Sequence, residues 1–559
     1  MKKFWKIILS GIVLLIIAPT SYLWAMVLLD SLYKYESPLK GTLPPNQPTQ
    51  PLVRQVVMVV VDGLRYDTSL EMPYLNSLRS KGASGVMVGI PNPASLSAWT
   101  TLISGAGPEI SGAPFLDPEH VRDIQPIAVD HLFAQVKRAG LTSGLVGSKR
   151  WQKLVSDQFL YAQFFGKDEA ADSEVVDVAL RFLRNFHLNY LLIHLSQVNH
   201  VSLEYGVNSS AYRQAALRVD AHLQDIAQAV NVERNVLIVV SDYGRLKRGE
   251  RNITAPFVMA GPAVLPGDYG YIAPTDVAPT VAALLGTAIP GAAQRPVRFD
   301  MLRMDPVQRA VKQVAQAQQQ LAFGKAYLDS IGSKPLSETA EGDVLVAISS
   351  LQVKNYVSAS TLGELAVQQI DIEVKQARAQ RIQSERTQRR MGALAAILAP
   401  LCIFWWKRSK RLGFLILTAL LTVAIYHLLF IREGNVYAPN IPRPVEPFLV
   451  ESLRRVAIAL AMGLAVVLGW LWYKRERSLL AVTQAVYGFA FVVLYFLGVQ
   501  VALGYWLNGP RVTWYLPDLT LFFVHFSALV QSAMVAALSV FLPLAVVPLY
   551  RVALLARPG

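Results

Sequence analysis

Long apolar runs at both ends of the chain leave this sequence few ways to fold outside a membrane. The run FWKIILSGIVLLIIAPTSYLWAMVLL follows Lys2 and Lys3, and it exceeds the ~20 apolar residues that span a bilayer. No small-residue cleavage motif follows it, so we interpret residues 1–29 as a retained signal-anchor. Apolar runs return near the carboxyl terminus, and we expect about five further transmembrane helices at residues 391–406, 412–431, 452–473, 479–507 and 518–549.

Basic residues suggest an orientation for these helices. If all six cross, the clusters at 407–411 and 474–477 lie on the same side as the amino terminus, which the positive-inside rule makes cytoplasmic. Residues 30–390 would then be extracytoplasmic. Three arginines that precede the second apolar run oppose this pattern, namely Arg386, Arg389 and Arg390.

The net charge and the single cysteine limit the binding partners and metal sites that this chain can have. The formal net charge is +14, and residues 371–411 hold ten Lys or Arg against three Asp or Glu, a difference of +7. Half of the excess therefore flanks a membrane span, where anionic lipid headgroups are a simpler partner than nucleic acid. Cys402 is the one cysteine, which excludes disulfides within the chain and Cys-rich zinc sites.

The segment between the apolar regions has the pattern of an α/β domain. After a Pro-rich linker at residues 30–52, strand-like runs alternate with helix-like ones through residues 53–304, which predicts a largely parallel sheet flanked by helices. Residues 305–390 are rich in Gln, Ala, Arg and Lys at helical spacing, and we interpret them as a helical stalk, with a partner-binding coiled coil as the alternative. The bundle occupies residues 391–559. The expected strands are residues 56–63, 85–90, 142–148, 189–196, 236–242 and 255–262.

Three polar residues stand where chemistry is often found in such a fold. Asp62 ends VVMVVVDG, Asp242 ends VLIVVSD, and Ser95 lies just before a helix-like segment in NPASLSAWTTLISG. A hydroxyl at a helix amino terminus suits a phosphate or sulfate group, and two nearby carboxylates can hold a divalent ion that activates the hydroxyl. Each residue alone also fits a turn or a helix cap.

The order of the motifs resembles the alkaline phosphatase superfamily, in particular its type I phosphodiesterase and nucleotide pyrophosphatase branch. VVMVVVDGLR, PNPASLSAWTTLISG, SQVNH, VVSDYG and PTDVAPTVAALLG follow one another over roughly residues 55–290. The resemblance implies phosphoryl or sulfuryl transfer with two metals, usually zinc, beside a Ser or Thr nucleophile. It further implies that Ser95 is the nucleophile and that Asp62, Asp242 and His200 are metal ligands.

The sequence departs from the family at several ligand positions. Tyr243 stands where the family's SDHG motif has His, and Ser196 stands where its DxxGH motif has Asp. The chain has no His between His222 and His427, so the family's last His ligand is missing. A remaining site of Asp, Asp and Ser oxygens suits Mg²⁺, Mn²⁺ or Ca²⁺ better than Zn²⁺. We therefore expect one divalent ion, Mg²⁺, Mn²⁺ or Zn²⁺, or no ion if the site is a relic.

Further polar residues have both a functional and a structural interpretation. His194 shares a strand with Ser196 and could replace a lost ligand, although a satisfied buried histidine is the simpler interpretation. Lys149 and Arg150, which follow a strand, could bind an anionic substrate, and so could Arg245 and Arg248 after the second aspartate motif, unless they are solvated loop charges.

Two function classes remain. One is a membrane-anchored phosphoester hydrolase or phosphotransferase that acts through Ser95 and a divalent ion. The layout is similar to that of the GPI ethanolamine phosphate transferases, which makes a lipid or envelope substrate worth considering by analogy. The other is a degenerate pseudoenzyme that serves as a structural or partner-binding subunit of a membrane complex.

Overall fold

The structure is a computed structural model whose chain divides into two compact units. One comprises Glu36–Arg381, and the other comprises Met1–Tyr35 together with Ile382–Gly559. The structure describes all residues except 1, 42, 45, 90–93, 115–116, 119, 157, 166–171, 243–253, 407–408, 436, 438–444 and 556–559.

The first unit contains an eight-stranded sheet in the order β4-β3-β5-β1-β6-β7-β2-β8. β7 runs antiparallel to both of its neighbours, and the other paired strands are parallel. This confirms the prediction of an α/β fold with a largely parallel sheet. The strands are β1 (Val56–Val61), β2 (Ala83–Val88), β3 (Ser143–Ser148), β4 (Tyr161–Phe165), β5 (Tyr190–Leu195), β6 (Val236–Val240), β7 (Thr254–Ala260) and β8 (Gly267–Ile272).

All six strands expected from the sequence are present, and two further strands form the edges of the sheet. β4 is mostly half-buried, and β8 is mostly exposed. An edge strand of this kind needs no continuous apolar run, because only part of it is buried. The apolar pattern therefore detects the inner strands and misses both edges.

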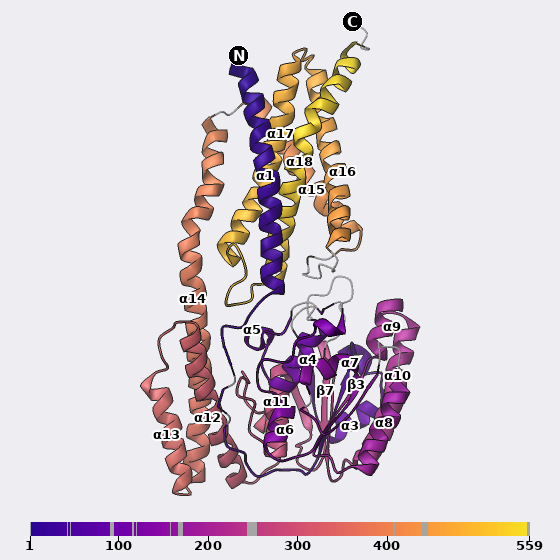
Figure 1. Ribbon diagram of the computed structural model, residues 1–559, viewed down its shortest axis with the longest axis vertical. Coiled ribbons are helices and arrows are strands. Elements are labelled where there is room, and N and C mark those ends of the chain that lie inside the picture. The colour runs from indigo at the N-terminus through magenta and orange to yellow at the C-terminus, as the bar shows by residue number, and fades with distance from the viewer. Residues whose placement is uncertain are drawn as a thin grey trace. The chain divides into compact units, whose positions relative to one another are not determined.

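Helices cover both faces of the sheet, and the side chains of β1 are therefore buried on both sides (Figure 1). Val56, Met58 and Val60 belong to one apolar core with α4, α6, α7 and α11. The alternate residues of β1 belong to a second core with α3, α8 and α10, as the two-residue period of a strand requires. The helices are α2 (Tyr66–Ser69), α3 (Pro73–Lys81), α4 (Ser95–Ser104), α5 (Pro108–Ser111), α6 (Leu132–Arg138), α7 (Lys149–Val155), α8 (Asp172–Asn185), α9 (Gln197–Tyr205), α10 (Ser210–Val230) and α11 (Val277–Leu285), with short 3-10 turns at η1 (Val121–Asp123), η2 (Pro274–Asp276) and η3 (Phe299–Met301).

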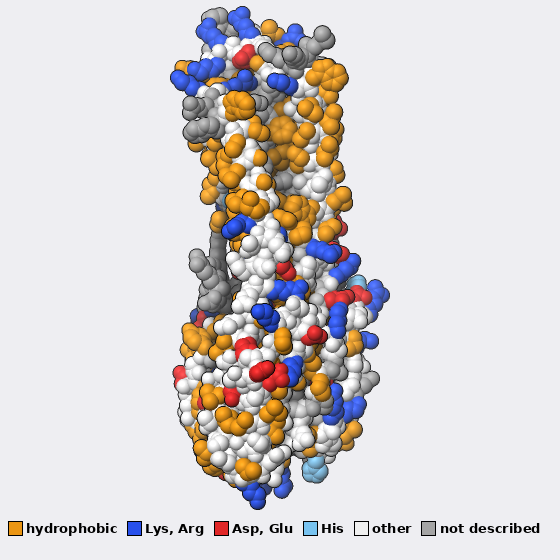
Figure 2. Space-filling view, turned by 90° about the vertical axis from the view of Figure 1, so that its left-hand side faces the viewer, with side chains coloured by type: hydrophobic (Ala, Val, Ile, Leu, Met, Phe, Trp, Pro, Cys, Tyr) orange, Lys and Arg blue, Asp and Glu red, His pale blue; other side chains and the backbone are white. Residues whose placement is uncertain are grey.

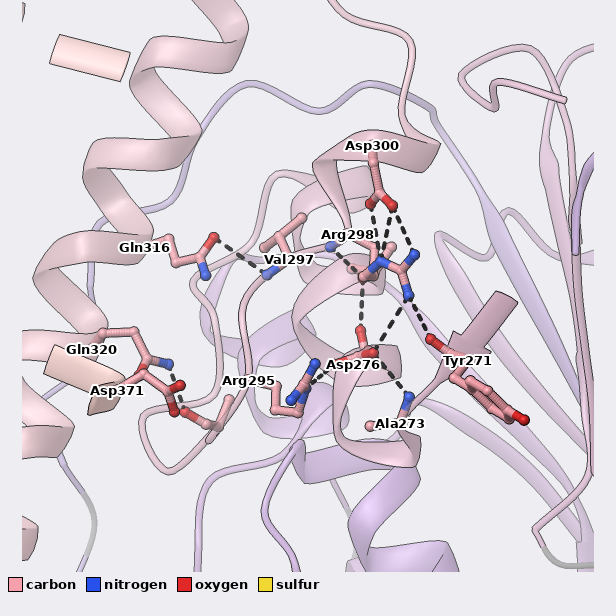
Figure 3. Close-up of polar contacts among 12 residues, drawn as sticks. Tyr271, Ala273, Asp276, Arg295, Val297, Arg298, Asp300, Gln316, Gln320 and Asp371 are labelled. Atoms are coloured by element: carbon pink, nitrogen blue, oxygen red, sulfur yellow. Dashed lines mark hydrogen bonds and ion pairs between the residues drawn. The ribbon is translucent and has the colours of Figure 1, made fainter. Parts of the chain in front are cut away.

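A buried carboxylate fixes the segment that follows α11 (Figure 3). Asp276 accepts hydrogen bonds from Arg295 Nε at 2.8 Å and from the backbone N–H of Ala273 at 2.9 Å. Arg298 lies 3.7 Å from the same carboxylate and also pairs with Asp300 at 2.7 Å. This carboxylate is satisfied by its own neighbours, so we assign it a structural role.

The segment predicted to be a stalk is helical. It contains α12 (Pro306–Ser330), α13 (Glu338–Gln352) and most of the 51-residue helix α14 (Tyr356–Trp406). Residues 305–381 belong to the same compact unit as the sheet. Gln319 and Gln320 on α12 donate to the carbonyls of Gly291 and Ala293, which explains why this Gln-rich helix is partly buried.

The second unit is helical and apolar. Among the described residues, five helices are long and apolar enough to cross a membrane. Apolar side chains cover much of this unit, and Lys and Arg gather at one end (Figure 2). The expected span at residues 391–406 forms the last part of α14, where Phe404 packs against Tyr495, and it is not one of the five candidates. They are α1 (Lys2–Tyr33), α15 (Lys410–Arg432), α16 (Glu446–Tyr473), α17 (Leu479–Asn508) and α18 (Leu519–Leu555), of which the candidate span in α1 is Trp5–Tyr33.

Candidate functional site

Neighbouring strand ends bring the two predicted carboxylates together. Asp62 follows β1 and Asp242 follows β6, and these two strands pair in parallel. The backbone N–H of Gly63 donates to Asp242 Oδ1 at 3.1 Å. Both aspartates are buried. Ser196 follows β5, the neighbour of β1 on its other side. All three residues therefore lie at the carboxyl ends of neighbouring parallel strands.

Ser95 is the first residue of α4 and its side chain is buried, with 7% of the residue exposed. One turn later on the same helix, Trp99 Nε1 donates a hydrogen bond to Asp242 Oδ2 at 2.9 Å. This contact ties the amino-terminal turn of α4 to the strand-end carboxylate. No sequence pattern singles out Trp99, because an aromatic residue within an apolar helix normally indicates core packing.

Asp62 has a partner that the sequence analysis missed. Asn199 on α9 donates from Nδ2 to Asp62 Oδ2 at 3.1 Å. The close approach of α9 requires a glycine at position 63, where φ is +76° and an added Cβ would lie 2.9 Å from the Cα and Cβ of Asn199. Asn199 stands directly before His200 in the SQVNH motif, which is the only signal that could have identified it.

His200, the next residue of α9, faces away from Asp62. Its side chain is half exposed, and its Nε2 is 4.0 Å from Oε2 of Glu204, one turn further along the helix. Successive residues of a helix point about 100° apart, so the turn that directs Asn199 toward Asp62 directs His200 away from it. The metal-ligand role that the resemblance implies for His200 stays a prediction, and this arrangement gives it no support.

A buried carboxylate lies next to Ser196, the position where the family has Asp. Asp172, at the start of α8, accepts the backbone N–H groups of Ser196 at 3.0 Å and Gln197 at 3.3 Å. Burial raises the pKa of Asp172 to about 6, against the opposing effect of these hydrogen bonds. The acid thus caps α9 from a distant helix, which no local sequence pattern would indicate.

His194 is buried, as predicted, but its ring nitrogens are not satisfied. Neither nitrogen has a hydrogen-bond partner among the described residues. The ring packs edge-on against Trp99 and Trp151, with centroids 4.4 and 6.0 Å away, and its Nε2 lies 4.0 Å from Asp62 Oδ2. Burial lowers the pKa of His194 to about 3, so the ring is neutral near pH 7.

Lys149 and Arg150, the basic pair after β3, have different environments. Lys149 is exposed, whereas Arg150 donates from a terminal guanidinium nitrogen to Asp117 Oδ2 at 3.1 Å. The same carboxylate accepts the backbone N–H groups of Ser95 at 3.2 Å and Leu96 at 3.0 Å. Arg150 therefore lies at the amino terminus of α4, beside the predicted nucleophile. The remaining predicted residues Tyr243, Arg245 and Arg248 lie outside the described part of the chain.

The possible metal ligands at these strand ends differ from those of a two-zinc centre. Within the described residues, no group of three or more His, Cys, Asp or Glu side chains could hold a metal ion. Both oxygens of Asp242 already accept N–H groups. Two carboxylates with a serine hydroxyl suit one oxygen-preferring cation that also binds water and substrate phosphate oxygens. They do not fit a pair of zinc ions, which would need further nitrogen or carboxylate ligands.

Comparisons with known proteins agree with the motif order. Residues 56–247 match the family model "Type I phosphodiesterase / nucleotide pyrophosphatase", and no curated protein matches the chain. Human ectonucleotide pyrophosphatase/phosphodiesterase 5 is a similar solved structure, with 13% identity, a TM-score of 0.37 and coverage of 45% of this chain and 100% of its own. An alkaline phosphatase superfamily protein from Vibrio parahaemolyticus has 15% identity, a TM-score of 0.36 and coverage of 50% and 79%. Residues 56–247 of this chain are therefore similar to the type I phosphodiesterase/nucleotide pyrophosphatase family.

Proposed function

We propose that this chain is a membrane-anchored phosphoester hydrolase or phosphotransferase in which Ser95 is the nucleophile. The observation that carries the proposal is the position of Ser95 at the first turn of α4, a helix joined through Trp99 to Asp242 at the end of β6. Asp62 ends the adjacent strand. These residues all belong to the segment that matches the phosphodiesterase family model.

The proposed reaction has two displacements at phosphorus. Ser95 Oγ forms a bond to the phosphorus as the P–O bond to the leaving alcohol breaks, and the serine proton leaves with that alcohol through solvent. Water, or a second hydroxyl compound in a transferase, then attacks the phosphoserine and regenerates the serine. The backbone N–H groups of Ser95 and Leu96 and the guanidinium of Arg150 are the donors that would bind the phosphoryl oxygens in both steps.

We further propose one divalent ion at the carboxylates of Asp62 and Asp242, with Mg²⁺ or Mn²⁺ as better candidates than Zn²⁺. An ion there would supply positive charge beside the transferred group and beside the serine oxygen. Asn199 and Gly63 orient the two carboxylates through their N–H groups. His200 is not assigned to this ion, because its side chain faces solvent and Glu204.

The candidate membrane helices support a substrate at a membrane surface. Five such helices accompany the phosphodiesterase-type domain in one chain, so we propose a lipid or envelope phosphoester as substrate and membrane lipids as neighbours. We propose that residues 391–406, at the end of α14, cross the membrane as well. With six crossings the Lys and Arg clusters lie on the side of the amino terminus, so the α/β domain faces the extracytoplasmic side.

A non-catalytic role is the second candidate, and one observation favours it. Asp62 and Asp242 accept N–H groups from Asn199, Gly63 and Trp99, so each carboxylate has hydrogen-bond donors from the protein without any cation. In that case the domain would serve as a scaffold or partner-binding subunit of a membrane complex.

Rapid quenching during the first turnover of a phosphodiester, followed by mass analysis, tests the proposal. We expect a phosphoryl group on the peptide that contains Ser95 in the full-length protein. Product release with no modified serine would contradict a covalent mechanism. A protein that turns over no phosphoester, retains no divalent ion on purification and carries a stoichiometric partner would support the scaffold role.

A further inference from the structure

A carboxylate from a distant loop occupies the amino terminus of α4. Asp117 Oδ1 accepts the N–H of Leu96 at 3.0 Å, and its Oδ2 accepts the N–H of Ser95 at 3.2 Å. Oδ2 also pairs with Arg150 at 3.1 Å. One carboxylate thus receives two backbone N–H groups and a guanidinium, which together form the set of donors that binds phosphate oxygens in proteins.

The helix itself offers no competing cap. The residue before Ser95 is Ala94, whose side chain cannot accept a hydrogen bond. The first N–H groups of α4 have no acceptor within the helix, so these groups and the positive end of the helix dipole are stabilised by an anion from elsewhere in the chain. Asp117 fills that position from 21 residues further along the chain, beside the serine that we propose as nucleophile.

The contact is open enough to be exchanged. The side chain of Asp117 is 23% exposed and that of Arg150 is 29% exposed. Both side chains are partly buried but reach solvent, so a phosphate group with more charge and more acceptor oxygens can compete for the same donors. The carboxylate and an incoming phosphate cannot use the N–H groups of Ser95 and Leu96 at the same time.

We infer that Asp117 is an internal competitor that holds the phosphate-binding position closed until an anionic phosphoester displaces it. The inference rests on the proposed function and adds a regulatory device to the same site. Displacement frees the N–H groups of Ser95 and Leu96 and releases Arg150 to the ligand. The ligand is recognised by its phosphate group, either as free phosphate or as part of a lipid head group.

Affinity for a phosphate ligand should therefore increase when Asp117 loses its charge. The apparent dissociation constant equals the intrinsic one divided by the fraction of molecules in the open state. If the carboxylate occupies the position in about nine-tenths of molecules, its removal tightens binding about tenfold. Asp117→Asn removes the charge and keeps one oxygen that can accept an N–H group, so α4 retains a cap.

The experiment is calorimetric titration of the full-length protein in detergent with inorganic phosphate and, in parallel, with a soluble glycerophosphodiester. Asp300→Asn is the matched control, because it removes the same charge from another Arg–Asp ion pair of this unit, the 2.7 Å pair with Arg298. We expect Asp117→Asn to bind about tenfold more tightly and Asp300→Asn to bind as the wild type does. Tighter binding of phosphate alone would identify free phosphate as the ligand, and tighter binding of the diester would identify a head group.

Three results would overturn the inference. Unchanged affinity in Asp117→Asn would make Asp117 only a helix cap, and weaker affinity would make it part of the ligand site. An Arg150→Gln variant that binds phosphate as well as the wild type would also contradict the assignment. The titration needs no turnover, so a protein in which Ser95 proves not to be a nucleophile can still give the predicted result.

Discussion

Trp99 Nε1 donates a hydrogen bond to Oδ2 of Asp242 at 2.9 Å, which joins the helix that begins with Ser95 to the end of β6. Phenylalanine at position 99 keeps an aromatic ring but removes this donor to a buried carboxylate. We expect Trp99→Phe to lower the free energy of unfolding by about 1 to 3 kcal/mol more than Trp151→Phe does. Trp151 is the matched control because it stacks on Trp99 and its Nε1 has no hydrogen-bond partner among the described residues. Equal losses, measured by chemical denaturation, would contradict a structural role for the Trp99–Asp242 contact.

Gly63 should tolerate alanine less well than another glycine with a similar positive φ. At Gly63 an alanine meets both a positive φ and the backbone of Asn199, whereas Gly140 has φ of +70° and nothing within 4 Å of an added Cβ. Alanine at Gly140 pays only the conformational strain of about 1 to 2 kcal/mol. We expect Gly63→Ala to lose a further ~1 kcal/mol or more, because α9 must shift. Similar melting temperatures for the two variants would show that α9 is not held in close contact there.

The stability of the α/β domain should depend on pH through His194. Burial lowers the folded-state pKa of His194 to about 3. The stabilisation that the neutral buried ring gives to the folded state is therefore fully present above the unfolded pKa near 6.5, and it is lost as the pH falls toward 3. In that window the loss is about 1.4 kcal/mol per pH unit. His194→Leu should remove this part of the acid sensitivity. The same substitution at the exposed His187 is the control, and equal pH profiles for wild type and His194→Leu would contradict the prediction.

The side of the membrane on which the domain lies can be tested with single cysteines. Cys402 is the one cysteine of the chain, so a Cys402→Ala background accepts one reporter at a time. We expect an impermeant maleimide to label Asp268→Cys, on the exposed edge strand β8, in intact cells. Arg477→Cys, in the exposed turn between α16 and α17, should be labelled only after the membrane is opened. The reverse pattern would contradict the proposed orientation.

The sequence predicted those parts of the fold that depend on local patterns. The buried apolar runs marked all six inner strands, and the ends of parallel strands predicted that Asp62 and Asp242 would meet. The missed residues have partners far away in the sequence. Asn199 contacts a carboxylate 137 positions earlier, and Asp117 caps a helix that began 22 positions before it. The motif match selected His200, whose role stays a prediction, and the helical register of α9 directs its neighbour Asn199 toward Asp62.

The central claim is that Ser95 is the nucleophile, and the turnover of Ser95→Ala tests it most directly. Ser97 is the matched control, because it lies two residues later in α4 and is also buried. In the full-length protein with a divalent ion and a phosphodiester substrate, we expect Ser95→Ala to lose turnover by about 10³-fold or more, while Ser97→Ala stays within a few-fold of the wild type. Both variants should keep the melting temperature of the wild type within a few degrees. Undiminished turnover in a folded Ser95→Ala protein would contradict the account.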